Sequence, residues 1–167
     1  MTKKTQYKLI IPIILISVIF VSGCINFSLL NINNILPELS NNIVEGDKLF
    51  NDGVILSNSK NYDAAEEKIG NSLSYFINAK NNIEELEKDL KNNNDTILNS
   101  YIFLLKQEVS YKENATDNLQ TAIRFFLAND TSNGNKYVNN ANKNMNNAID
   151  IQKERNQIVI DNPEKFK

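Results

Sequence analysis

Histidine and tryptophan are absent from this 167-residue sequence, and cysteine occurs once. Without histidine, the chain lacks the ligand on which haem, zinc and di-iron sites in helical proteins commonly depend. A Ser-His-Asp triad is excluded for the same reason, and a single cysteine forms no internal disulfide bond. We therefore expect no resident metal or cofactor, and we expect that the protein is not an enzyme.

Clustered positive charge is also lacking. The chain has 18 basic and 20 acidic side chains, a net charge of −2, and its lysines are scattered along the sequence. Binding to the phosphate backbone of a nucleic acid needs a concentrated positive field. We therefore expect no nucleic-acid partner.

The N-terminus has the pattern of an export signal. Lys3, Lys4 and Lys8 precede an apolar stretch over residues 9–21, which is interrupted at two positions. A helix that spans a bilayer needs about 20 apolar residues, so this stretch is short for a span. A basic start, a short apolar middle and small residues at the end are typical of a secretory signal peptide.

The residues that end this stretch, Val21-Ser22-Gly23-Cys24, resemble the lipobox of secreted lipoproteins. The resemblance implies that residues 1–23 are removed and that Cys24 becomes a lipidated N-terminus. The mature chain would carry 15 basic and 20 acidic side chains, a net charge of −5. The alternative is an uncleaved membrane anchor over residues 9–25. In both cases the lysines stay in the cytoplasm, and the rest of the chain is extracytoplasmic, at the cell surface or in the periplasm.

The remainder of the chain predicts helices. Residues 24–36 have no clear period and are expected to form a tether, followed by a bundle domain over residues 37–167. Apolar residues then recur every three or four positions, with breaks rich in Asn, Asp, Ser or Gly. The predicted fold class is all-α, an up-and-down antiparallel bundle of four helices over about 37–57, 62–91, 96–128 and 134–160.

The first two helices have a seven-residue spacing like that of a coiled coil. Folding them into an antiparallel hairpin across residues 58–61 places small residues opposite each other. Gly53 then lies opposite Ala65, and Gly46 lies opposite Ser72. Because glycine in a helix costs roughly 1 kcal/mol relative to alanine, we expect close packing of the helices to recover that loss.

The same hairpin, around residues 46–79, resembles a single tetratricopeptide unit. Gly53 and Ala65 match its small positions, and NYDAA resembles its turn. Asp52 departs from the pattern, the closing proline is missing, and no second copy follows. A repeat array is therefore not expected, because solenoids need about three units.

The third helix has a wide apolar face that is interrupted by Lys112. A pocket lined by Tyr101, Tyr111 and Lys112 is the candidate binding site for a small ligand. The fourth helix is thinner and rich in asparagine, and Arg155 stands in line with its apolar residues. Its apolar positions are Val138, Ala141, Met145, Ala148, Ile151, Ile158 and Val159. Pairing the third and fourth helices predicts an ion pair between Arg155 and Glu108; the alternative is that the Arg155 side chain extends along the helix to place its charge in solvent.

Four sequons (Asn-x-Ser/Thr) are candidate glycosylation sites on an exported chain: Asn26, Asn94, Asn114 and Asn129. Taken together, these features favour a lipid-anchored extracytoplasmic bundle. Its expected role is that of a non-catalytic module that binds a protein or a component of the cell envelope. The alternative is a small-ligand carrier or sensor with a pocket near the middle of the third helix.

Overall fold

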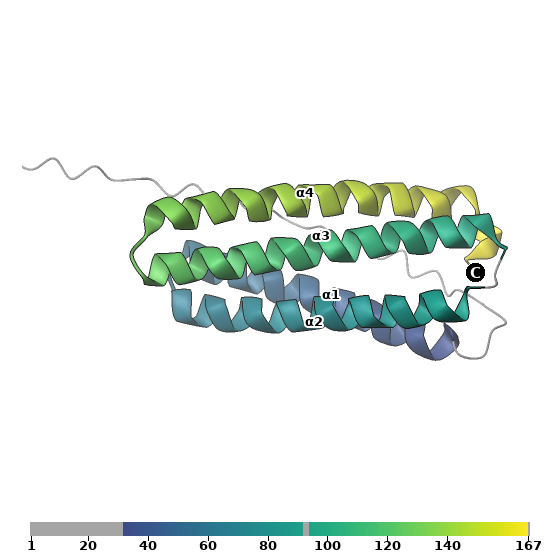
Figure 1. Ribbon diagram of the computed structural model, residues 1–167, viewed down its shortest axis with the longest axis horizontal. Coiled ribbons are helices and arrows are strands. Elements are labelled where there is room, and N and C mark those ends of the chain that lie inside the picture. The colour runs from purple at the N-terminus through teal and green to yellow at the C-terminus, as the bar shows by residue number, and fades with distance from the viewer. Residues whose placement is uncertain (1–31, 92–93, 167) are drawn as a thin grey trace, which may run out of the picture.

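The computed structural model describes residues 32–91 and 94–166, so the signal segment, Cys24, Asn26 and residues 24–31 of the expected tether lie outside the described residues. The described chain forms an all-α bundle of long antiparallel helices (Figure 1). Its elements are α1 (Ile32–Asn58), α2 (Tyr62–Asp89), α3 (Thr96–Leu127), α4 (Thr131–Asp161) and the short 3₁₀ helix η1 (Pro163–Lys165). The predicted four-helix fold is confirmed.

The beginning of α1 differs from the expectation. The helix starts at Ile32, so the last five residues of the expected tether are helical and Pro37 lies inside the helix. The sequence predicts the start at residue 37 because the helical spacing of apolar residues becomes clear only from there. The helix extends upstream because Ile35 is buried in the core and Leu36 packs against it.

In two of the three connections between helices, an aspartate caps the start of the following helix. The side chain of Asp95 accepts hydrogen bonds from the backbone N–H groups of Ile97 and Leu98, and so caps the start of α3. Asp130 caps α4 in the same way through the N–H of Asn133. The turn before α4 passes through Asn129 at φ 60°, a left-handed conformation that asparagine tolerates.

The register predicted for the first hairpin is confirmed. The Ser72 hydroxyl donates to the Gly46 carbonyl oxygen at 2.8 Å, so these two residues lie opposite each other. A Cβ atom on Gly53 would lie 2.4 Å from Ile69 Cδ1 and 3.5 Å from the Ala65 carbonyl oxygen. Glycine at position 53 is therefore what allows α1 and α2 to approach closely.

The second hairpin pairs α3 with α4. Near its turn, the rings of Phe125 and Tyr137 stack with centroids 5.4 Å apart. A Cβ atom on Gly134 would lie 2.3 Å from the ring of Phe126. Here too, glycine allows two helices to approach closely. Further along, Arg155 reaches Glu108, as the sequence predicted.

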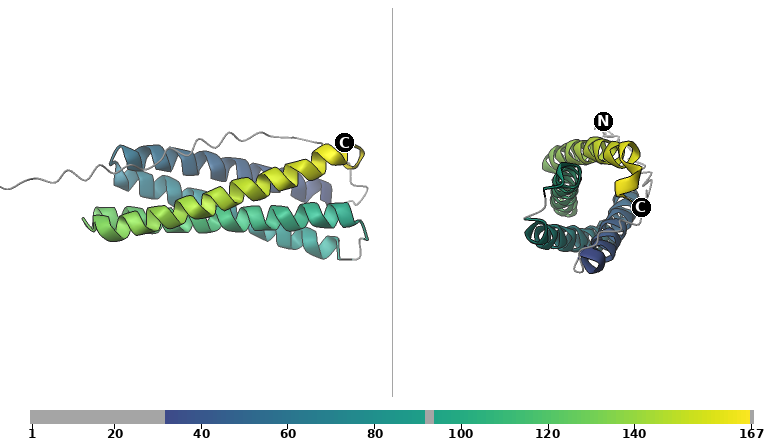
Figure 2. Two further views of the ribbon diagram at one scale, coloured as in Figure 1. Left: turned by 90° about the horizontal axis from the view of Figure 1, so that it is seen from above. Right: turned by 90° about the vertical axis from the view of Figure 1, so that its right-hand side faces the viewer.

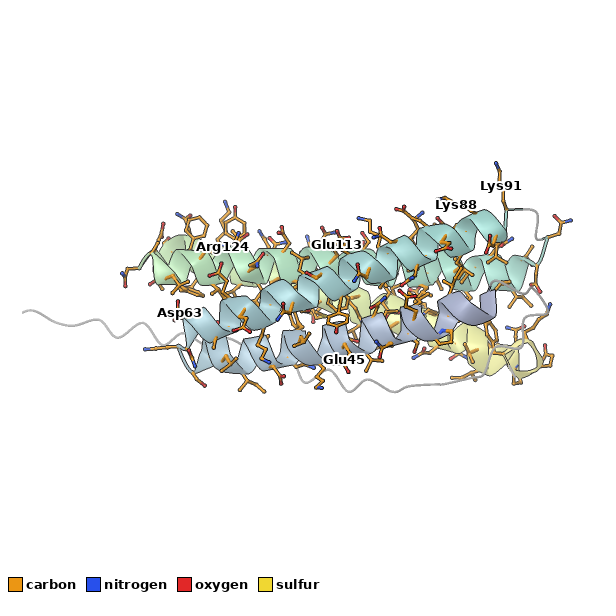
Figure 3. The ribbon with its side chains drawn as sticks, turned by 90° about the horizontal axis from the view of Figure 1, so that it is seen from below. Glu45, Asp63, Lys88, Lys91, Glu113 and Arg124 are labelled. Carbon is orange, nitrogen blue, oxygen red and sulfur yellow. The ribbon has the colours of Figure 1, made fainter. Side chains whose placement is uncertain are left out.

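The two hairpins join along α2 and α3. Three ion pairs cross this boundary: Lys80–Glu113, Lys106–Glu87 and Arg124–Glu66. Figure 3 shows Glu113 and Arg124 on the edge of α3 that borders α2. By contrast, no described Cα atom of α1 lies within 8 Å of one of α4. Figure 2 shows α4 running obliquely across the bundle rather than parallel to α3.

The core consists of two apolar clusters. The first lies near the α1–α2 and α3–α4 turns, and all four helices contribute to it. The second lies toward the other end of the bundle and is built from α1, α2 and α3 alone. Between them, several polar and charged side chains are buried: Asp47, Ser72, Glu108, Lys112 and Thr116.

Candidate functional site

The most unusual site in the described chain is a layer of buried charges, here called the charge layer and formed by Asp47, Glu108, Lys112 and Arg155. Lys112 Nζ donates to Asp47 Oδ2 at 2.7 Å and lies 3.0 Å from Glu108 Oε1. Arg155 Nε donates to Glu108 Oε2 at 2.8 Å. Two carboxylates and two cations from α1, α3 and α4 therefore balance one another.

Burial in this layer is nearly complete. The Glu108 side chain is 0% exposed, and those of Asp47 and Lys112 are each 2% exposed. The Arg155 side chain is the most exposed of the four, at 14%. Buried ions of this kind are tolerated when each is paired, and leaving one of them without a partner is costly.

The surroundings shift the pKa values of the layer. Burial raises the pKa of the Asp47 carboxyl above its ordinary value, although the Lys112 ammonium opposes this shift. Within the described residues, Asp47 Oδ1 has no hydrogen-bond partner, so its charge is only partly compensated. Burial also works against the charge of Lys112, but Asp47 and Glu108 outweigh it and raise the pKa of the Lys112 amine.

The residues that the sequence suggested for ligand binding are only partly brought together. Lys112 belongs to the charge layer, and Tyr101 joins it because its hydroxyl accepts a hydrogen bond from Arg155 Nη1 at 2.9 Å. Tyr111 instead packs against the first apolar cluster. A ligand that uses Lys112 would have to compete with two carboxylates for its ammonium group.

Asp47 was missed by the sequence reasoning. It lies four residues after Ile43 and three before Phe50, on the side of α1 that faces α3. A charged residue at a helical spacing between apolar residues is the sequence pattern that could have indicated a buried charge at Asp47. The apolar spacing of α1 predicts only its contact with α2, whereas Asp47 contacts Lys112 of α3.

The candidate modification sites are spread over the molecule. Asn94 precedes α3 at one end of the bundle, and Asn129 follows α3 at the other. Asn114 lies on the outer face of α3, and all three are exposed. The sequence predictions for Cys24 and Asn26 concern residues outside the described part of the chain.

A shallow groove runs along the outside of the first hairpin. Its lining residues come from α1 and α2: Glu45, Leu49, Asn71, Ser74, Tyr75 and Asn78. Large apolar side chains are exposed elsewhere, among them Ile55 at 61% in the last turns of α1 and Leu127 at 39% at the end of α3. These two lie at the end of the bundle that carries the α1–α2 and α3–α4 turns.

Among residues 32–91 and 94–166, no group of three or more Cys, Asp or Glu side chains is placed to hold a metal ion. None of the helices in this part of the chain has both the length and the apolar character of a membrane span. Comparison of the chain with known protein families, curated proteins and solved structures finds no match.

Proposed function

We propose that the protein is a lipid-anchored, extracytoplasmic helical bundle that acts as a non-catalytic binding module for a protein or a cell-envelope component. One observation carries this proposal. A basic start and a short apolar stretch end at Val21-Ser22-Gly23-Cys24, the pattern at which exported lipoproteins are cut and lipidated.

The geometry of the bundle is compatible with such an anchor. Cys24 precedes the start of α1 by eight residues, and the C-terminal end of α4 lies at the same end of the bundle as that start (Figure 1). The α1–α2 and α3–α4 turns lie at the opposite end. The end with the turns is called the distal end, and the end nearer to the start of α1 is called the proximal end. Since α3 has 32 residues, the two ends are about 48 Å apart.

The distal end is the favoured contact surface. Ile55 and Leu127 are exposed there, close to the two turns. A contiguous exposed apolar patch marks a surface that binds other macromolecules, and we propose that Ile55 and Leu127 belong to such a surface. An anchored bundle would hold this surface away from the bilayer, where a partner can reach it.

The first experiment tests the anchor. Intact-mass spectrometry of the membrane fraction should find the chain beginning at Cys24, with an added diacylglycerol-type lipid. Cys24→Ser should remain at the mass of the full precursor. A native chain with its leader intact and Cys24 unmodified would support the uncleaved anchor and contradict lipidation.

The second experiment tests the contact surface. The intact lipidated protein is cross-linked on membranes, and the captured molecules are compared between Ile55→Asp and Phe103→Ser. Phe103 is also exposed, but it lies in the first turns of α3, toward the proximal end. We expect Ile55→Asp to lose the captured molecules and Phe103→Ser to keep them. Equal capture by the two variants would contradict a distal contact surface.

A further inference from the structure

The two halves of α4 are held to the bundle in different ways. Every buried residue of α4 lies between its start and residue 148: Gly134, Val138, Ala141, Met145 and Ala148. From residue 149 to the end of the helix no residue is buried, and Ile160 is 63% exposed. The sequence had placed Ile151, Ile158 and Val159 on the same core-facing strip, but the structure leaves all three only partly buried.

The lack of buried residues follows from the shape of the bundle. The second apolar cluster, beside which this part of α4 runs, is built from α1, α2 and α3 and contains no residue of α4. In addition, no Cα atom of α4 approaches α1 within 8 Å in the described chain. The hydrophobic effect therefore stabilises the part of α4 after residue 148 much less than the part before it.

Specific contacts to α3 hold this part of the chain in place. Arg155 binds Glu108, donates to the Tyr101 hydroxyl, and lies 5.3 Å from the centroid of the Tyr101 ring. After η1, Phe166 is buried, and its ring centroid lies 5.0 Å from that of Tyr101. Lys165 forms an ion pair with Asp95, the residue that caps α3. Tyr101 thus receives both Arg155 and Phe166.

Separation of Arg155 from α3 would leave the other three members of the charge layer in contact with one another. Glu108 uses Oε2 for Arg155, while its Oε1 lies 3.0 Å from Lys112 Nζ. When Arg155 leaves, Glu108 still has a buried cation beside it, and Lys112 remains bound to Asp47. The Arg155 side chain, already 14% exposed, moves into water. Lys112 then faces both carboxylates, which lowers the penalty for breaking the Arg155–Glu108 pair but leaves the remaining layer one positive charge short.

We propose that residues 149–166 form a releasable segment, here called the C-terminal strap, whose contacts with Tyr101 and Glu108 open while the rest of the bundle stays folded. Opening removes Arg155 and Phe166 from Tyr101. It thereby uncovers the face of α3 where Tyr101 packs against the second apolar cluster. The strap covers that face in the closed state and exposes it in the open state. This inference does not depend on the lipid anchor or on the distal contact surface.

The absence of tryptophan provides a direct test. In Phe166→Trp, the only indole of the chain reports on the strap, while far-UV circular dichroism reports on all helices. We expect the tryptophan emission to shift to the red at a lower urea concentration than that of the helical transition. Coincident transitions would show that the strap opens only when the bundle unfolds, and would overturn the proposal.

Hydrogen exchange measured on the full chain tests the contacts. Amides of residues 152–165 should exchange about tenfold faster than those of residues 135–148, because local opening exposes only the former. Arg155→Met should accelerate exchange in the strap further and leave residues 135–148 unchanged. Lys153→Met is the matched control, since Lys153 lies in the strap but pairs only with the exposed Asp150. Equal protection of the two segments, or acceleration of all helices by Arg155→Met, would contradict a separately opening strap.

Discussion

Neutralising Glu108 is the sharpest test of the charge layer. Glu108 is the one carboxylate that contacts both cations, Lys112 through Oε1 and Arg155 through Oε2. Glu108→Gln keeps the size of the side chain and removes its charge. The layer then holds two cations and only the Asp47 carboxylate.

The expected cost follows from burial. Removing one partner of a buried ion pair typically costs about 3–5 kcal/mol. Here Arg155 can turn toward solvent, and the amide oxygen of glutamine still accepts a hydrogen bond, so we expect a loss of about 2–4 kcal/mol. That is a large part of a typical unfolding free energy of about 5–15 kcal/mol.

Urea unfolding followed by circular dichroism measures this loss. Glu113→Gln is the matched control, because Glu113 also lies on α3 and pairs with a lysine of a neighbouring helix, but both partners are partly exposed. The control should cost less than about 1 kcal/mol, as surface pairs do. Arg155→Met added to Glu108→Gln should recover part of the loss, because it removes a cation that has lost its partner.

The result that refutes the reasoning is a Glu108→Gln variant no less stable than Glu113→Gln. The same holds if the double variant loses the full sum of its single losses, because coupled residues should not behave additively. Either outcome would mean that the buried charges contribute nothing specific to the register of α3 and α4.

Two further predictions concern stability. Gly53→Ala should lower the unfolding free energy by about 1–3 kcal/mol, because the new methyl group overlaps Ile69. Gly70→Ala is the control and should be neutral or stabilising, because its methyl group meets only the end of the Gln120 side chain. Equal effects of the two variants in thermal melts would contradict the close approach at Gly53. Burial raises the pKa of Asp47 above its ordinary value of 3.8, so the folded state takes up this proton more readily than the unfolded state. As the pH falls from 7 through the raised pKa toward 3.8, the wild type should therefore gain stability relative to Asp47→Asn, in which Glu108, Lys112 and Arg155 are unchanged. A relative loss of stability over that range would contradict a raised pKa.

Much of the fold follows from local patterns in the sequence. Apolar periodicity and the Asn- and Asp-rich breaks predicted the four helices, with ends that differ from the observed ones by a few residues. Small residues at Gly46 and Gly53 predicted the register of the first hairpin, because close approach needs them on facing positions. The Arg155–Glu108 pair was predictable because both residues interrupt apolar strips at matching levels.

Other features depend on the tertiary arrangement, which no local pattern contains. The partner of Lys112 comes from α1, 65 positions away in the chain, so only the packing of the two hairpins brings Asp47 to it. The part of α4 after residue 148 has the apolar spacing of a buried helix and yet has no buried residue, because α1 does not come close enough to cover it. Phe166 lies beyond the predicted helix, and its burial depends on η1 turning the chain back toward Tyr101.

The separation of α1 from α4 has a consequence for folding kinetics. Because no described Cα atom of α1 lies within 8 Å of one of α4, the fold depends mainly on contacts between helices that follow each other in the chain. Each hairpin closes across a turn of three residues, between 58 and 62 and between 127 and 131, so its loop-closure entropy is small. Helical proteins dominated by such local contacts fold in microseconds to milliseconds. During synthesis, the α1–α2 hairpin can therefore form before α4 has left the ribosome, and the second hairpin then adds to a surface that is already in place.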